Sequence, residues 1–447
     1  MQNSKIRRGA LLVALTIVLG TVAPIAAPLA SAGSSAARPI VFVHGFSGSG
    51  AQFETQARRF SSNGYDDKAI AAVDYDSTFG SETTDDVYRR LDGIIEGLLE
   101  RSGGEQVDLL AHSLGTRLMQ EYLRSSPDRA ARVAHYVNLD GLPSGDPPGG
   151  VPTMAIWGRG DPAREIAGAE NVRFDDQTHT QTVTSPETFE EIYEFFNGKA
   201  PRTTEIRPEA DGSAALSGRA VLFPQNVGVD DATLEIYEVD ERGERQSTRP
   251  VETFPLRGTG QWGPFEGKGD QRYELAIVRT GAPVHHLYSE PFLRDDRWIR
   301  LLTSPPGEGI GALITTGPDQ SGLVVQRYKE WWGDQGDDND VLEVNGEDVL
   351  NAANTPIDKR AIGMFLFDDE NDGATDLSAP IPALAGLPFI TGADVFIPAS
   401  TVGAATTKVR STPRGGTGKV VRMDVPAWPS TDHRISIVFS DHLQNAR

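Results

Sequence analysis

Short apolar segments alternate with segments of helical periodicity from residue 38 to about residue 199. The apolar runs at 39–43, 69–74, 107–110, 133–139 and 153–157 predict strands. Between residues 87 and 99 the apolar side chains recur at spacings of three and four, which indicates one face of a helix. Strands that alternate with helices favour a parallel sheet covered by helices on both faces. We therefore predict an α/β domain over residues 33–202.

The pattern changes after Lys199 to apolar residues at every second position, interrupted by Gly, Pro and Asp. This alternation is typical of antiparallel strands with one buried face. The chain of 447 residues is also longer than one hydrophobic core usually organises. We expect a small β-sandwich over residues 203–281 and a second β-rich domain over residues 282–447.

The first 32 residues have the layout of a secretory signal peptide. Three basic residues precede an apolar run at 10–22, and small residues follow up to Ala32. Pro24 and Pro28 interrupt the apolar run before it reaches the length that spans a membrane. We predict cleavage after Ala32 and a secreted, extracellular protein without a transmembrane anchor.

Composition narrows the classes of partner. The chain has 42 Lys and Arg against 63 Asp and Glu, which gives a formal net charge of −21 and argues against nucleic acid and anionic membrane surfaces. It has no cysteine, so it forms no disulfide and offers no thiol for lipid attachment. Oligomeric state leaves no signal in this sequence.

The strongest chemical signal is the segment Ala111-His112-Ser113-Leu114-Gly115, which follows a predicted strand and precedes a predicted helix. Small residues two positions before and after Ser113 permit the tight turn that exposes a nucleophilic hydroxyl at the end of a sheet. The same serine could instead be an ordinary helix cap. The strand before it and the helix after it favour the nucleophile.

A second signal, His44-Gly45-Phe46, follows the first predicted strand. Its glycine allows a backbone amide to approach a developing oxyanion, and by position the amides of Phe46 and Leu114 would form the oxyanion hole. Alone, these residues could be a simple glycine turn. Their combination with the Ser113 motif favours the functional interpretation.

A serine nucleophile needs a general base and an acid that orients it. Within residues 114–202 the histidines are His135, inside a predicted strand, and His179, in a polar loop. The loop position favours His179. Asp140 and Asp161 both follow predicted strands, and either could orient the imidazole. Each could also serve only as a turn or cap residue.

At these motifs the chain resembles the small bacterial lipases with an Ala-His-Ser-x-Gly elbow. Over a longer stretch it resembles archaeal-type lipases that carry a C-terminal β-barrel domain. This second likeness rests on residues 112–116, on Asn138-Leu139-Asp140-Gly141, and on Thr178-His179 with the following segment 184–187. The archaeal-type resemblance implies Asp140 as the acid, whereas the bacterial one implies Asp161; we favour Asp140 because that likeness covers more sequence.

The resemblance implies a carboxylic ester hydrolase, most simply a triacylglycerol lipase that needs no cofactor. A short-chain esterase or a polyester depolymerase would use the same residues. An inactive extracellular binding protein is the alternative from another class, but every catalytic position holds a competent residue. The short connection between Gly45 and Ser113 leaves little room for an inserted lid. We expect the β-rich half to cover the acyl site instead.

Two weaker signals remain. Asp368, Glu370 and Asp372 alternate like the first half of a calcium-binding loop, but Ala379 stands at the twelfth position, so a solvated acidic turn is favoured. The Trp331-Trp332 pair and the apolar segment 383–390 could line an acyl site, although core packing is the commoner fate of such residues.

Overall fold

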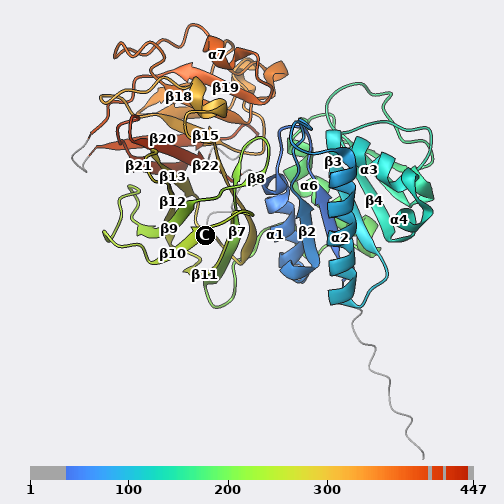
Figure 1. Ribbon diagram of the computed structural model, residues 1–447. Helices are drawn as coiled ribbons and strands as arrows, with labels where there is room; N and C mark the ends of the chain where they lie inside the picture. Colours follow the sequence, from blue (N-terminus) through green and yellow to red (C-terminus); the bar gives the residue numbers. More distant parts are fainter. Residues whose placement is uncertain (1–36, 401–404, 416–418, 441–447) are drawn as a thin grey trace, which may run out of the picture. The chain divides into compact units, whose positions relative to one another are not determined.

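The N-terminal half is built on a sheet of six parallel strands in the order β2-β1-β3-β4-β5-β6 (Figure 1). The computed structural model describes residues 37–400, 405–415 and 419–440, so the predicted signal peptide lies outside the described residues. The strands are β1 (Ile40–Val43), β2 (Ile70–Val73), β3 (Val107–His112), β4 (Val133–Leu139), β5 (Thr153–Trp157) and β6 (Glu170–Arg173). The predicted parallel sheet is therefore confirmed.

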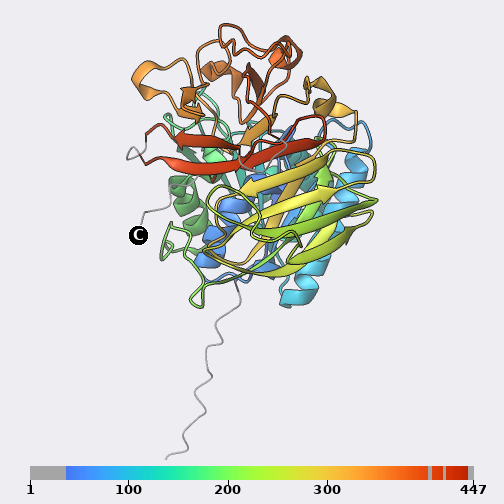
Figure 2. The ribbon, with the colours of Figure 1, turned by 90° about the vertical axis from the view of Figure 1, so that its left-hand side faces the viewer.

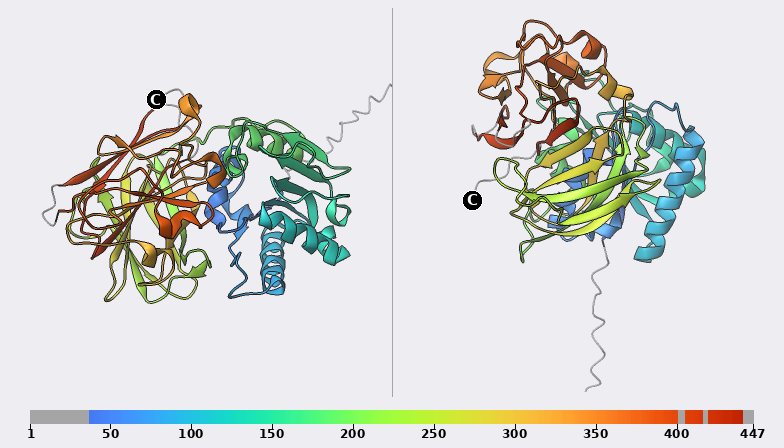
Figure 3. Two further views of the ribbon diagram at one scale, coloured as in Figure 1. Left: turned by 90° about the horizontal axis from the view of Figure 1, so that it is seen from above. Right: turned by 60° about the vertical axis from the view of Figure 1, so that its left-hand side comes forward.

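Helices cover both faces of this sheet (Figure 3, left). On one face, α2 (Thr84–Ser102) and α3 (Leu114–Ser125) pack against every second residue of the central strands and form one hydrophobic core with them. Within it, Tyr88 packs edge-on against Tyr122. On the other face, α1 (Glu54–Ser62) and α6 (Pro186–Asn197) meet through Phe60 and Phe189. The shorter elements are the 3-10 helix η1 (Gly50–Phe53), α4 (Pro127–Ala131) and α5 (Gln181–Thr184).

The helix ends follow from local sequence. α2 starts at a capping box in which Thr83 and Asp86 bond each other's backbone amides, and it stops at Gly103 in the left-handed conformation. α6 starts at Ser185, whose hydroxyl accepts from the Thr188 amide, with a proline at its first position.

The second half contains three sheets (Figure 2). One has eight strands in the order β10-β9-β12-β13-β22-β15-β18-β19, one has the order β11-β7-β14 with β8 paired to β7, and one has the order β17-β16-β20-β21. The first contains β9 (Ala232–Val239), β10 (Glu252–Leu256), β12 (Arg272–Val278), β13 (Val284–Ser289), β15 (Leu323–Gln326), β18 (Gly363–Phe367), β19 (Ile390–Asp394) and β22 (His433–Val438). The second contains β7 (Ser213–Leu222), β8 (Val227–Gly228), β11 (Gln261–Lys268) and β14 (Asp296–Thr303). The third contains β16 (Val341–Val344), β17 (Glu347–Asp348), β20 (Thr406–Thr412) and β21 (Val421–Pro426).

The strand pairing does not separate the two β segments that the sequence suggested. Residues 281 and 282 lie between β12 and β13, which are antiparallel neighbours in one sheet, and β14 pairs with β7 from the earlier segment. The sandwich core also draws on Leu287, Phe292 and Leu301 from the later segment. The predicted boundary fails because strand pairing depends on which strands pack together in the folded protein. The change of hydrophobic periodicity along the sequence marks only where the β structure begins.

A buried carboxylate joins the two halves. Asp74, just after β2, accepts hydrogen bonds from Arg219 at 2.8 Å and Arg300 at 2.9 Å, both from the second half, and from the Gly50 amide at 2.7 Å. Burial alone would raise the pKa of Asp74, but the two guanidinium groups outweigh it and lower the pKa to about 2. The ion pairs therefore hold this joint together while Asp74 is ionised.

We predict that Asp74→Asn lowers the free energy of unfolding by about 3–5 kcal/mol, because it leaves buried guanidinium groups without a charged partner. Because the pKa of Asp74 is depressed in the folded state, its contribution is complete above its ordinary value of 3.8 and is lost as the pH falls towards 2. Urea unfolding at neutral and acidic pH measures both effects. The control is Asp231→Asn, whose carboxylate is 97% exposed; equal losses in the two variants would contradict the prediction.

Candidate active site

Ser113 occupies a sharp turn between β3 and α3. Its backbone has a φ of 52°, in the left-handed region that a residue with a side chain seldom adopts. Gly115 is required beyond it, because an added Cβ would lie 2.5 Å from the carbonyl oxygen of His44 and 2.6 Å from that of Val43. The start of α3 thus packs directly on the end of β1 and presents Ser113 at the sheet edge.

The turn after β1 approaches this serine closely. A Cβ on Gly45 would lie 2.8 Å from the Cβ of Ser113, so only glycine fits there. Phe46 and Ser113 line the same cavity, and Leu114 is the first residue of α3, so its amide has no acceptor within the helix. Both amides of the predicted oxyanion hole therefore belong to backbone segments that meet at Ser113.

His44 braces this turn and is not charged. Its Nδ1 donates to the Gly45 carbonyl at 2.8 Å, and its Nε2 accepts from the Tyr75 amide at 3.2 Å. The Asn226 amide lies 3.4 Å from the same Nε2 and also donates to the carbonyl groups of Gly48 and Tyr75. Burial lowers the pKa of His44 to about 4, so the imidazole is neutral at neutral pH.

The His179 ring is oriented by Asp140. The His179 Nδ1 lies 2.6 Å from Asp140 Oδ2, and the other carboxylate oxygen accepts from the Gly158 amide at 2.9 Å and from Arg164 at 2.8 Å. Burial alone would raise the pKa of Asp140, but these partners, with His179 foremost, lower it to about 2. Asp140 is thus ionised at neutral pH and can hold an imidazolium.

The other candidates from the sequence lie elsewhere. Asp161 is exposed, and its carboxylate accepts from the Ala163 amide at 2.9 Å within its own turn. His135 lies in β4, and its Nδ1 is 2.8 Å from the buried Asp108. Of the two aspartates considered, Asp140 is the one that reaches His179.

A chain of hydrogen bonds that the motifs did not reveal connects the Ser113 turn, through His112, with the loop that carries His179. The Gln52 side chain donates to His112 Nδ1 at 2.8 Å, and His112 Nε2 donates to the His179 carbonyl at 3.0 Å. The Gly45 amide donates to Gln52 Oε1 at 3.4 Å. Burial, followed by the nearby His179, lowers the pKa of His112 well below its ordinary value, so this ring stays neutral. His112 stands beside Ser113 in the motif, but nothing in the sequence marks Gln52.

Residues of the β-rich half hold the His179 loop from outside. The buried Glu330 carboxylate accepts from the Thr180 amide at 2.7 Å and from the Thr178 hydroxyl. The Phe389 ring stacks on His179 with ring centres 6.3 Å apart. Glu330 precedes the Trp331-Trp332 pair but carries no motif of its own, so the sequence offered no signal for it.

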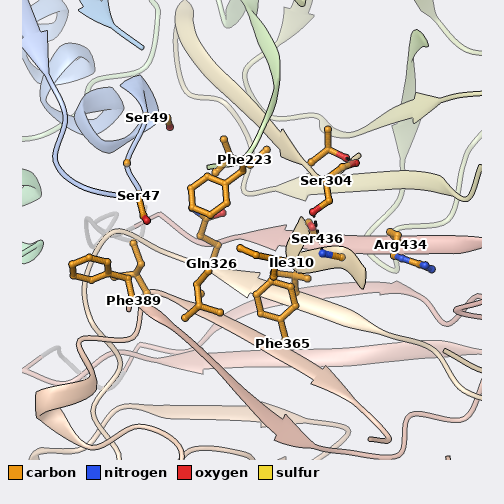
Figure 4. A pocket seen from close by; sticks show the side chains of 18 of the residues that line it. Ser47, Ser49, Phe223, Ser304, Ile310, Gln326, Phe365, Phe389, Arg434 and Ser436 are labelled. Atoms are coloured by element: carbon orange, nitrogen blue, oxygen red, sulfur yellow. Dashed lines mark hydrogen bonds between the residues drawn. The ribbon is translucent and has the colours of Figure 1, made fainter. Parts of the chain in front are cut away.

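A cavity of about 180 Å³ opens beside Ser113 and His179 and extends into the β-rich half (Figure 4). One face of the eight-stranded sheet supplies part of its wall. The apolar side chains that line the cavity come mainly from the β-rich half and include Phe223, Ile310 of the 3-10 helix η4 (Gly309–Leu313), Ile314, Val324, Phe365, Phe389 and Ile390.

Of the two apolar segments that could line an acyl site, one contributes to the cavity and the other does not. The apolar segment 383–390 contributes Pro388, Phe389 and Ile390 to the cavity, while Leu384 of α7 (Pro382–Ala385) packs in a small core. Trp331 and Trp332 are buried away from it, against Arg327 and Arg414 respectively.

The calcium candidate does not assemble. Asp368 is buried, and its carboxylate accepts from the Asp372 and Gly373 amides at 3.1 and 2.8 Å. Over the described ranges, no group of three or more His, Asp or Glu side chains is placed to hold a metal ion. The carboxylates of Asp368 and Asp372 instead stabilise backbone turns.

Comparisons with known families agree with this architecture. Residues 45–147 match the lecithin:cholesterol acyltransferase family, residues 212–306 match the lipase C-terminal domain, and residues 309–443 match a further C-terminal domain family. The chain thus has an α/β-hydrolase-like parallel sheet followed by a C-terminal β region, and segments of both are similar to lipase and acyltransferase families. In the part of the chain that the structure covers, no helix is both long and apolar enough to cross a membrane.

Several solved structures are distantly similar. Lipase B of Aspergillus fumigatus is 14% identical, with 38% of this chain and 55% of that chain covered and a TM-score of 0.31. The lipase BlEst2 of Bacillus licheniformis, in its propeptide form, is 12% identical, with 87% and 93% covered and a TM-score of 0.30. Likenesses at this level carry no information on substrate.

We predict that Glu330→Ala lowers kcat for p-nitrophenyl butyrate by about 10–100-fold, because small displacements of a reacting group are costly. The variant leaves the Thr180 amide unpaired beside His179. Glu330→Gln keeps an acceptor for that amide and should recover most of the loss. Stopped assays give kcat and KM, and thermal unfolding reports the fold. A Gln variant as impaired as the Ala variant would contradict a positioning role through this acceptor.

Proposed function

We propose that this protein is a secreted hydrolase of carboxylic esters that acts through an acyl-Ser113 intermediate, with triacylglycerols as its preferred substrates. The observation that carries the proposal is the cavity, which begins at Ser113 and His179 and continues between apolar side chains. A reactive hydroxyl at the mouth of an apolar cavity suits a substrate with an ester at one end of a hydrocarbon chain. Secretion rests on the signal-peptide pattern of residues 1–32.

The hydrogen-bond pattern supports a specific course for the proton transfers. Because His179 Nδ1 faces the ionised Asp140, its proton lies there and Nε2 is left as the basic nitrogen. Nε2 takes the Ser113 proton while the hydroxyl oxygen attacks the ester carbonyl. It then returns that proton to the departing alcohol as the acyl-enzyme forms. In the second half, Nε2 takes a proton from water as the water oxygen attacks the acyl carbonyl, and it then gives that proton to the Ser113 oxygen as the carboxylic acid leaves.

Charge that develops on the carbonyl oxygen would be stabilised by the amides of Phe46 and Leu114. These amides are fixed by the turn at Gly45 and by the start of α3, so they need little rearrangement as the oxyanion forms. The imidazolium that forms on His179 is stabilised by Asp140, whose pKa of about 2 keeps it ionised throughout the neutral range. This chemistry requires no cofactor.

A short-chain esterase or polyester depolymerase is the second candidate, since both would use the same catalytic residues. The apolar wall formed by Phe223, Ile310 and Phe365 favours the lipase, because a short acyl group would leave that surface unused. An inactive binding protein is disfavoured by the ordered hydrogen bonds around His179, which serve no evident purpose in binding.

We expect a fluorophosphonate to label the wild-type protein at Ser113, and Ser113→Ala to abolish both labelling and ester hydrolysis. Asp140→Asn should lower kcat by about 10⁴-fold, because an amide favours the wrong imidazole tautomer. Asp161→Asn serves as the matched control and should be mild, since its carboxylate only caps an exposed turn. Labelling that persists in Ser113→Ala, or the reverse order of the two Asn variants, would overturn the assignment.

Filling the cavity tests the acyl site. Gly363 lines it, and an added Cβ there would lie 3.8 Å from Ile390, in ordinary contact. We predict that Gly363→Val lowers the ratio of palmitate to butyrate ester hydrolysis by roughly tenfold or more, at about 0.8 kcal/mol for each methylene excluded. The control is Gly386→Val, at an exposed glycine with open space around it. Chain-length profiles that coincide for the two variants would place the acyl chain elsewhere.

A further inference from the structure

Two arginines lie in the wall of the cavity within the β-rich half. Arg279 directly follows β12, and Arg434 lies in β22, in register with His285 of the neighbouring β13. In the view of Figure 4, Phe223 and Ile310 lie between Ser47 on one side and Ser304 and Arg434 on the other. The cavity therefore joins a reactive end, an apolar middle and a basic end.

No carboxylate balances this basic end within the described residues. The residues that line the cavity there include no Asp or Glu. This is notable in a chain that has 63 acidic residues against 42 Lys and Arg. Neither Arg279 nor Arg434 forms an ion pair with any described residue. Two cations are thus held in a partly buried site without a permanent counter-charge.

The hydrogen bonds of these arginines are few. Arg279 Nη1 lies 3.5 Å from the Thr303 hydroxyl and 3.4 Å from the Ser304 carbonyl, and its Nη2 is buried with no acceptor among the described residues. Arg434 Nη1 donates to the carbonyl of His433 at 3.0 Å and to that of Ser430. A buried donor of a charged group that lacks an acceptor is costly, so it needs an explanation.

His285 adds no charge of its own. Its Nδ1 lies 2.9 Å from the Thr303 hydroxyl and its Nε2 lies 2.8 Å from the Ser436 hydroxyl, so both ring nitrogens have partners. Burial, followed by the charges of His286, Arg279 and Arg434, lowers the pKa of His285 to about 3. The ring is neutral, and both guanidinium groups act on it from nearby.

We propose that this basic end is an anion-binding subsite, which holds a carboxylate or phosphate at the far end of the hydrocarbon chain whose ester lies at Ser113. The inference rests on the proposed ester hydrolysis at Ser113 and adds a second substrate class beside triacylglycerols: esters whose apolar chain ends in an anionic oxyacid. Such a group accepts charge-assisted hydrogen bonds from guanidinium nitrogens and supplies the acceptor that Arg279 Nη2 lacks. The apolar middle of the cavity holds the chain between the two ends.

The test uses the full-length protein and p-nitrophenyl monoesters of α,ω-diacids of graded length, each compared with the same diacid capped as its methyl ester. At the length that spans the cavity, the free carboxylate should raise kcat/KM at least about tenfold over the capped ester, as expected for charge-assisted bonds. Arg279→Met and Arg434→Met should each reduce that ratio, and the double variant should bring it near one. Arg249→Met, which replaces an exposed arginine outside the cavity, should leave the ratio unchanged.

A ratio near one at every length, or a ratio that survives in the double variant, would overturn the subsite. If a variant does not fold, the salt dependence of the wild-type protein tests the subsite. Added salt should lower the ratio of kcat/KM for the free carboxylate to that for the capped ester, while the capped ester is hydrolysed at the same rate. A ratio that does not change with salt contradicts the proposal. Long-chain alkyl phosphates and alkanoates as competing inhibitors distinguish phosphate from carboxylate recognition. Calorimetric titration of Ser113→Ala with a long diacid reports the subsite separately, so its failure is distinguishable from failure of the ester hydrolysis.

Discussion

Parallel pairing of β1, β3 and β4 brings the carboxyl ends of three strands to one edge of a sheet, and the site depends on this constraint. The Gly45 turn, Ser113 and Asp140 are far apart in the sequence and become neighbours only because those strands run side by side. The turns are tight enough that Gly45 and Gly115 tolerate no side chain. The positive φ values of Ser113 and Asp140 are stable only because such packing holds them.

The β-rich half contributes in two ways to the site at the carboxyl ends of these strands. It supplies groups that hold hydrolase segments in place: Asn226 at the turn after β1, the arginines around Asp74, and Glu330 beside His179. It also supplies most of the apolar wall of the cavity. The absence of a long insertion between Gly45 and Ser113 is consistent with this arrangement, because the cover comes from another part of the chain.

The histidines of the site differ in their surroundings and therefore in their roles. His44 and His112 have lowered pKa values because of burial, and they act as neutral braces with one donating and one accepting nitrogen. His179 Nδ1 instead lies 2.6 Å from the ionised Asp140 carboxylate. The same fold thus provides one imidazole oriented by a carboxylate and two that keep the surrounding backbone in position.

The sequence by itself determined the parallel sheet and marked Ser113 and His179 as candidates, because these depend on local periodicity and short motifs. Strand position alone did not separate Asp140 from Asp161, because both follow strands; the resemblance favoured Asp140, and the tertiary structure shows that this carboxylate reaches His179. Nothing in the sequence marked Gln52, Glu330 or the Arg279 and Arg434 pair. Their importance comes from what surrounds them, and pairing between strands distant in the sequence, such as β13 with β22, is decided by the packing of the whole chain.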